Sequence, residues 1–288
     1  MASPVEAGLV RIGILHSLTG TMAISERSLV EAALVAVDEI NQAGGLLGAR
    51  VEAVAADGAS NPATFAQRAQ ELLDAGAVAL FGCWTSASRK AVKPVVEAAE
   101  GLLWYPVQYE GLEESPHIVY TGSCLNQQVT PAVAWATAQF GTRVFLLGSD
   151  YVFPRTANRL VRSLVEGPGD GGRIVGEAYA GLGEQDFGEA LRQIAEQRPD
   201  FVLNTLNGDS NLAFYRQAHE AGLDPAHTPV LAVSVGETEL QSLAPLAAGH
   251  LACWSYFQSL DNPENQHFVA RFRARLCVRA ANLASPAP

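Results

Sequence analysis

Residues 82–90, GCWTSASRK, decide the fold of this chain, because they join the end of a predicted strand to the start of a predicted helix. The apolar run before them, residues 77–81, is typical of a strand buried on both faces. Small hydroxyl residues follow Gly82, and apolar residues at helical spacing begin just after the stretch. We therefore expect Thr85 or Ser86 to cap a helix whose first N–H groups point outward.

A second stretch, residues 103–111 (LWYPVQYEG), carries another aromatic side chain at the end of a predicted strand. Trp84 and Tyr105 are thus expected at the ends of neighbouring parallel strands. The carboxyl ends of such strands form the ligand crevice of open α/β sheets. Free N–H groups, hydroxyls and flat aromatic side chains suit a small polar molecule. The two stretches therefore predict a pocket for a small polar ligand.

The composition predicts a globular protein with a substantial core and argues against a nucleic-acid-binding surface. The chain has 288 residues, of which 48% are hydrophobic and 17% charged, enough for one large or two medium domains. Its net charge is -11, and the acidic residues are distributed along the chain, whereas a nucleic-acid surface needs a basic stripe. No apolar run reaches the length that spans a membrane.

The first residues lack the features of a secretory signal peptide. The segment of residues 1–7 is short, contains Glu6, and has neither a basic residue nor an apolar core. Two interpretations stay open on these grounds: a cytoplasmic protein, or the mature part of an exported one.

The cysteines and histidines predict neither a metal site nor a catalytic centre. The four cysteines form no CxxC pair, and the six histidines form no HxH or HExxH motif. No GxSxG elbow, GxGxxG or GxxxxGK[ST] motif occurs either. We expect no enzyme, no cofactor and no metal. Buried free thiols are the expected state of the cysteines, and their spacing leaves a Cys124–Cys253 disulfide open.

Strand and helix patterns alternate along the chain in two series. In the first series, strands are expected at residues 10–15, 51–56, 77–81, 102–104 and 118–120, and helices at 24–41, 62–75 and 86–99. In the second, helices are expected at 129–140, 154–165, 187–197 and 211–221, and strands at 143–147, 174–179, 201–205 and 230–233. This alternation predicts an α/β fold of two doubly wound parallel-sheet lobes with a ligand cleft between them.

Longer motifs accompany the two opening stretches in a fixed order: SLTG at 17–20, Pro94, WYPVQYEG at 104–111, SPHIVYTG at 115–122 with NQQ at 126–128, and GSDYVFPRTAN at 148–158. Together they resemble the type I periplasmic-binding-protein family, and within it the branch that binds urea and short-chain aliphatic amides. The resemblance covers about residues 10–275. Members of this branch are either substrate-binding proteins of ABC importers or cytoplasmic amide sensors that control an amidase operon.

The importer kind is the more similar of the two, because Trp84, Thr85 and Ser86 occur together with Val107. It implies urea or a short-chain amide as ligand, an ABC permease as membrane partner, and a location outside the cytoplasm. The sensor kind implies a regulatory partner and a cytoplasmic location. A branched-chain amino-acid receptor shares the fold, but its ligand needs charged partners, whereas the expected site is mostly aromatic and neutral.

The resemblance also implies the division of the chain. Residues 1–123 are expected to form lobe I, residues 124–253 lobe II, and residues 254–288 a return segment toward lobe I, with hinges near 122–125 and 253–256. Family members continue beyond residues 268–275, whereas residues 276–279 and those after them do not match. The chain therefore resembles one truncated or altered near its C-terminus, and residues 280–288 (AANLASPAP) have the composition of a disordered tail.

Ligand contacts are expected at strand ends in both lobes. We expect the Ser86 hydroxyl to donate to the ligand carbonyl and Glu237 to accept from the ligand N–H groups. The alternative for Ser86 is a plain helix N-cap, and for Glu237 an acidic residue that the helix dipole favours in the first turn. Aromatic walls are expected on either side. The complete set is Trp84, Thr85, Ser86, Tyr105 and Val107 in lobe I, and Asp150, Tyr151, Phe153 and Glu237 in lobe II.

Overall fold

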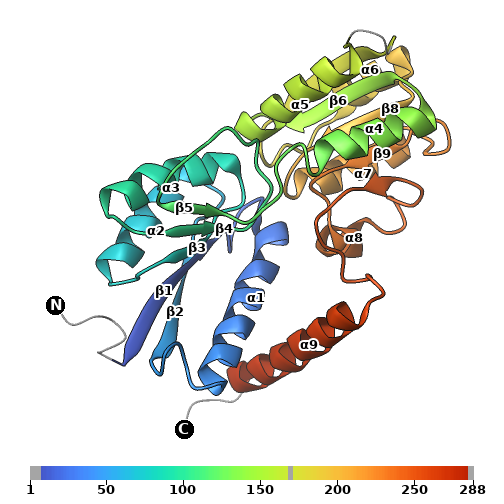
Figure 1. The fold of residues 1–288 in the computed structure, drawn as a ribbon. Coiled ribbons are helices and arrows are strands. Elements are labelled where there is room, and N and C mark those ends of the chain that lie inside the picture. Colours follow the sequence, from blue (N-terminus) through green and yellow to red (C-terminus); the bar gives the residue numbers. More distant parts are fainter. Residues whose placement is uncertain (1–7, 168–170, 285–288) are drawn as a thin grey trace.

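The chain folds into two α/β lobes with a long C-terminal helix that returns to the first lobe (Figure 1). The structure, a computed structural model, describes residues 8–167 and 171–284. Lobe I contains β1 (Leu9–His16), α1 (Ala23–Gln42), β2 (Arg50–Asp57), α2 (Pro62–Asp74), β3 (Leu80–Gly82), α3 (Ser86–Ala98), β4 (Leu103–Tyr105) and β5 (Ile118–Tyr120).

Lobe II repeats the same type of strand and helix alternation. Its elements are α4 (Val129–Phe140), β6 (Arg143–Ser149), α5 (Val152–Val165), β7 (Arg173–Ala180), α6 (Gly188–Gln197), β8 (Phe201–Thr205), α7 (Ser210–Glu220), β9 (Val230–Ala232), α8 (Glu237–Leu243) and β10 (Leu251–Ala252). The last element, α9 (Pro263–Ala284), follows the second connection between the lobes.

The two sheets have the same topology. Among the described residues, the parallel sheet of lobe I has the strand order β2-β1-β3-β4-β5, and that of lobe II the order β10-β9-β8-β6-β7. Renumbered from the first strand of each lobe, both follow the doubly wound order 2-1-3-4-5. The predicted fold class is therefore confirmed. In this order the ligand crevice lies beside the first and third strands, which are β1 and β3 in lobe I and β6 and β8 in lobe II.

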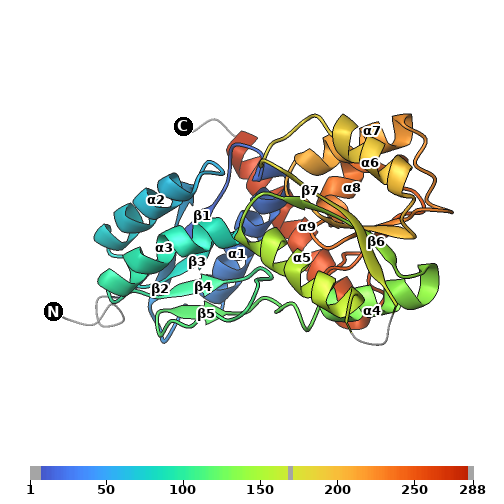
Figure 2. The same cartoon turned by 90° about the horizontal axis from the view of Figure 1, so that it is seen from above.

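Alternating side chains of the central strands build a core on each face of the lobe II sheet. Val144 and Leu146 pack with residues of α4 and α5, whereas Phe145 and Leu147 pack with residues of α6 and α7. Successive side chains of a strand point to opposite faces, so a fully apolar strand needs helices on both sides. Figure 2 shows these helices around the sheet. This packing holds the carboxyl ends of the strands in place.

The helix starts follow local signals in the sequence. Asn61 accepts hydrogen bonds from the N–H groups of Ala63 and Thr64, at 2.9 and 3.2 Å, and caps α2. Thr85 accepts from the N–H of Ser88 at 3.0 Å and caps α3. The choice between Thr85 and Ser86 is thus decided, since Ser86 is the first residue inside the helix.

The C-terminal helix differs from the expected disordered tail. Helix α9 lies against α1, where Arg271 pairs with Glu39 at 3.7 Å, and it extends to Ala284. The tail prediction is therefore wrong for residues 280–284, and residues 285–288 lie outside the described residues. Asn262 starts the helix by accepting from the Asn265 N–H at 2.8 Å, and alanine-rich sequence continues it because alanine has the highest helix propensity.

All four cysteines fall within the described residues, and each is a free thiol. Cys83 is buried, Cys124 and Cys253 are half-buried, and Cys277 is exposed. The expectation of buried thiols is therefore right for Cys83 alone. Burial, helped by the charge of Glu26, raises the pKa of the Cys83 thiol.

Two glycine substitutions test the close packing at the end of β3. Gly82 has φ +155, and a Cβ there would meet the Leu15 carbonyl oxygen at 1.9 Å, whereas Gly76 has φ +88 and open space around it. We expect Gly82→Ala to lower the free energy of unfolding by about 3 kcal/mol or more, because backbone must move. Gly76→Ala should cost about 1 kcal/mol of backbone strain. Guanidinium unfolding measures both, and equal losses would contradict the packing at Gly82.

Candidate functional site: the cleft between the lobes

The carboxyl ends of the two sheets face each other and meet through a tryptophan. The indole Nε1 of Trp84, just after β3, donates to Asn207 Oδ1, just after β8, at 3.2 Å. The Trp84 ring also stacks on Trp254 of the second connection, with centroids 5.5 Å apart. The hydroxyl of Tyr105 donates to the Trp84 carbonyl at 2.6 Å and holds this loop in place. These contacts lie beside the topological switch points, where ligands of open α/β sheets bind.

A polar clasp closes the cleft at the start of α1. Thr21 Oγ1 donates to the Asp209 carboxylate, and the Asp209 N–H donates back to the Thr21 carbonyl at 3.1 Å. Ser25 Oγ donates to the buried Glu239 carboxylate in α8. We call these four residues the Thr21–Asp209 clasp. They join lobe I directly to lobe II, so the structure has the lobes closed.

Two glutamines, one in the loop after β4 and one just before α4, donate to the residues that follow β9. Gln108 Nε2 donates to the Val233 carbonyl at 3.3 Å and to Ser234 Oγ at 3.1 Å. Gln128 Nε2 donates to the same carbonyl at 3.0 Å and to the Cys253 carbonyl at 2.7 Å. Because Gln128 and Cys253 lie on different connections, these bonds hold the two connections side by side. This is where the hinges were expected.

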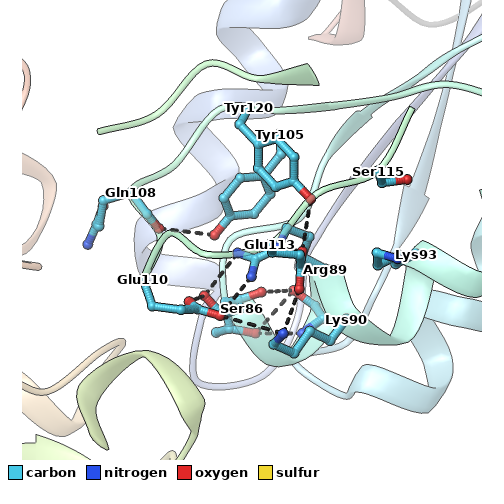
Figure 3. Close-up of polar contacts among 12 residues, drawn as sticks. Ser86, Arg89, Lys90, Lys93, Tyr105, Gln108, Glu110, Glu113, Ser115 and Tyr120 are labelled. Carbon is cyan, nitrogen blue, oxygen red and sulfur yellow. Dashed lines mark hydrogen bonds and ion pairs between the residues drawn. The ribbon is translucent and has the colours of Figure 1, made fainter. Parts of the chain in front are cut away.

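A buried charge network lies directly beneath Ser86 (Figure 3). The side chain of Arg89 is fully buried, and its Nη2 donates to Glu110 Oε1 at 2.9 Å, while its Nε donates to Glu113 Oε1 at 2.7 Å. Its Nη1 donates to Ser86 Oγ at 3.0 Å, and Ser86 Oγ donates to Glu110 Oε2 at 2.6 Å. Lys90, at the surface, pairs with Glu113 Oε2 at 2.5 Å.

Three tyrosines enclose the Arg89 guanidinium. Its central carbon lies 4.8 Å from the ring centre of Tyr105, 5.2 Å from that of Tyr109 and 5.9 Å from that of Tyr120. Aromatic faces attract cations, and this attraction is strongest where water is excluded. Burial lowers the pKa of the Arg89 guanidinium, but the charges of the surrounding groups outweigh it and raise the pKa overall. The arginine therefore stays charged inside lobe I.

The carboxylates respond to the same network. Burial favours the neutral form of Glu113, but hydrogen bonds from Arg89 and Lys90 outweigh it and lower the pKa of Glu113 to about 2. Across the cleft, burial raises the pKa of the Tyr151 phenol well above its usual value, with contributions from the charges of Tyr105 and Glu110. Tyr151 directly precedes α5, which contacts α3 of lobe I, the helix that begins at Ser86.

Seven of the nine expected site residues are buried or pack against the core of their own lobe, near the ends of the strands. Tyr105 and Val107 are buried in the lobe I core around the network. Tyr151 precedes α5 and packs, with Phe153, against the core of lobe II. Trp84 contacts the other lobe directly, through Asn207, and Thr85 and Ser86 are buried at the start of α3.

The two expected acidic contacts lie apart from this group. Asp150 is exposed and pairs with Arg155 at 2.6 Å, and it does not cap α5. Glu237 accepts hydrogen bonds from the backbone N–H groups of Gln258 and Ser259. In the same helical turn, Glu239 points into the interface between the lobes instead.

Several residues of the site were absent from the sequence-based set. The sequence could have indicated two of them. Arg89 lies one helical turn after Ser86, and Glu110 belongs to the second opening stretch, residues 103–111. The sequence did not indicate Asn207, Trp254 and Glu239, because their place depends on how the two lobes close on each other. Among the described residues, no group of three or more histidine, cysteine or acidic side chains is arranged to hold a metal ion.

The comparisons with known proteins identify the family. A family model described as "Periplasmic binding protein domain" matches residues 10–285. The chain belongs to this family. The match extends past residues 276–279, which were expected to depart from the family pattern. In the described part of the chain, no helix has the length and hydropathy needed to cross a bilayer.

Known members of the family bind several kinds of small molecule. The "Leu/Ile/Val-binding protein homolog 6" of Brucella melitensis is 25% identical over 280 residues, covering 94% of this chain and 70% of that protein. A solute-binding protein of an ABC transporter from Rhodopseudomonas palustris, in complex with 3,4-dihydroxybenzoic acid, has a TM-score of 0.82 at 22% identity, covering 93% of this chain and 74% of that one.

An isoleucine complex has the same fold. The branched-chain amino-acid transporter substrate-binding protein LivJ of Streptococcus pneumoniae, with isoleucine, has a TM-score of 0.78 at 20% identity, covering 93% of this chain and 77% of that one. Likeness at this identity shows the fold and leaves the ligand open. The family and these neighbours are solute-binding proteins.

Acid titration tests the charge network. The low pKa of Glu113 stabilises the fold fully above the ordinary value of 4.5, and this contribution is lost as the pH falls toward 2. We expect Glu113→Gln to lower the melting temperature at pH 7, and its difference from wild type to shrink steadily below pH 4.5. Glu114→Gln, an exposed neighbour, is the matched control and should follow wild type. A constant difference for Glu113→Gln down to pH 2.5 would contradict the network.

Proposed function

We propose that this chain is the substrate-binding component of an ABC importer, and that its ligand is urea or a short-chain aliphatic amide. Family membership supports the receptor role, and solute binding without turnover follows from it. An ABC permease is then the membrane partner, and the chain acts outside the cytoplasm.

The charge balance beneath Ser86 is the observation that carries the ligand proposal. Two cations, Arg89 and Lys90, face two carboxylates, Glu110 and Glu113. The guanidinium is buried and already hydrogen-bonded, so it offers no charge to a carboxylate ligand. Burying an unpaired charge is costly. A neutral, polar and flat molecule between Trp84 and Tyr151 avoids that cost.

Lobe closure is the proposed mechanism. The side chains around Ser86 are buried when the lobes are closed, so the ligand must enter while they are apart. The connections between the lobes then bend, and the Thr21–Asp209 clasp forms across the mouth. Only a difference in affinity between the open and closed forms can shift this equilibrium. The permease would recognise the closed form.

A second candidate is an amino-acid ligand, and one buried carboxylate favours it. Glu26 is 1% exposed and accepts from His16 Nδ1 at 2.9 Å and from the Ser17 N–H at 2.8 Å. It lies in the first turn of α1, which contacts lobe II through the Ser25 hydroxyl and Glu239. Such a carboxylate is a partner for an α-ammonium group. Arg89 would not pair with the ligand's own carboxylate, because it already bonds to Ser86, Glu110 and Glu113.

A ligand panel tests the proposal. We expect urea or acetamide to bind in isothermal titration with no consumption of ligand, and leucine and 4-hydroxybenzoate to bind at least about tenfold more weakly. Binding of acetamide alone would favour an amide sensor. Tight binding of leucine or 4-hydroxybenzoate without urea or amide binding would overturn the ligand assignment. Trp84→Ala should abolish binding of the true ligand, whereas Trp135→Ala, on the exposed side of α4, should not.

The clasp gives a second test that leaves the aromatic pocket untouched. Asp209→Ala removes the acceptor for Thr21 Oγ1, and hydrogen bonds to charged groups contribute about 1.5–3 kcal/mol. Weakening the closed form reduces apparent affinity in proportion to its population. We expect Kd to rise about tenfold, mainly through faster dissociation. Asp224→Ala, an exposed lobe II carboxylate bound to His227, is the control, and an equal loss there would contradict the clasp.

A further inference from the structure

We infer that Ser86 and Glu110 present a wall of hydrogen-bond acceptors to the ligand, with Arg89 positioning both of them. The N–H end of an amide or urea then faces lobe I, and carboxylates of the same shape are rejected. This inference rests on the proposed function, because it names how that pocket distinguishes an amide from an acid.

The single proton of the Ser86 hydroxyl is already used. Ser86 Oγ donates to Glu110 Oε2 at 2.6 Å and accepts from Arg89 Nη1 at 3.0 Å. A hydroxyl has one proton and two acceptor lone pairs. One lone pair therefore remains for the ligand, and Ser86 accepts from an N–H group. This is the reverse of the role expected from the sequence, in which Ser86 donates to a carbonyl.

Glu110 adds further acceptor capacity beside Ser86. An ionised carboxylate has about four lone-pair positions. Ser86 uses one on Oε2, and Arg89 Nη2 uses one on Oε1 at 2.9 Å, with Lys90 Nζ farther off at 3.7 Å. Glu110 is bonded to Ser86, the first residue of α3, and α3 contacts α5 of lobe II. Two adjacent acceptors suit the two N–H groups of a planar amide or urea.

Arg89 holds this arrangement without touching the ligand. Its guanidinium is fully buried beneath Tyr105 and Tyr109, and its three bonds run to Ser86, Glu110 and Glu113. The planar fork of arginine keeps such bonds in fixed directions. With Arg89 donating from one side, the Ser86 proton is directed to Glu110. Arg89 is thus a positioning residue.

Acetamide and acetate are the matched probes for the wall. They share shape and size, but acetamide brings an NH₂ group where acetate brings a second negatively charged oxygen. In acetate, an oxygen would face the acceptor oxygens of Ser86 and Glu110. Buried acceptors would then lack a donor, which costs free energy. We expect the wild-type protein to bind acetamide at least about 100-fold more tightly than acetate at pH 7.

Glu110→Gln tests the inference. The glutamine amide can donate to an acetate oxygen, so the preference for acetamide over acetate should fall at least about tenfold. Glu114→Gln is the matched control, because it removes the same charge from an exposed side chain of the same loop, and should change the preference less than about threefold. An equal effect of the two substitutions would overturn the inference, since net charge alone would then set the preference.

Ser86→Ala keeps the test independent of how well Glu110→Gln folds. It removes one acceptor and should weaken acetamide about fivefold or more while leaving acetate unchanged or tighter. An equal loss of affinity for acetamide and acetate would overturn the inference. If the wild-type protein binds acetamide but Glu110→Gln keeps the full preference, this inference alone fails. If it binds neither urea nor acetamide, the proposed function fails and this inference with it.

Discussion

The buried ion pairs of Arg89 are the constraint on which the rest of lobe I depends. A guanidinium in the interior is tolerated only when carboxylates and hydrogen bonds compensate it, and removing one partner costs several kcal/mol. Glu110 and Glu113 supply the charges, and Tyr105 supplies an aromatic face. The loop after β4 must therefore fold back over the start of α3. That requirement brings the two opening stretches of the sequence together.

The same compensation determines what the cleft offers to a ligand. Because the positive charge is satisfied inside lobe I, the surface that remains consists of a tryptophan, hydroxyls and carboxylate oxygens. Lobe II adds Asn207 and Tyr151 across the cleft, and the clasp at Asp209 closes it. Specificity and closure are thus built from different residues. A substitution in the clasp is therefore expected to change closure while ligand specificity can still be measured.

Much of the architecture could be predicted from the sequence, because apolar runs and helix caps are local signals. The strand ends that carry Trp84 and Tyr105 followed from such runs, and Thr85 was one of two expected caps. The acidic contact was harder. Glu237 and Glu239 lie two residues apart in α8, and only the helix start decides which of them points to lobe I. That start is stabilised by the hydrogen bond from the Gly236 N–H to Glu239, whereas the pairing of Trp84 with Asn207 depends on contacts between the lobes.

Structures that share this fold bind chemically different ligands. The parallel sheets and their switch points are common to receptors for an aromatic acid and for isoleucine, so the fold supplies a place to bind but not a charge. In this chain the loop after β4 supplies the two carboxylates that pair with Arg89. A buried arginine that already has two carboxylate partners cannot serve a carboxylate ligand, whereas one with a free face can. The proposed preference for an uncharged ligand therefore depends on the pairing of Arg89.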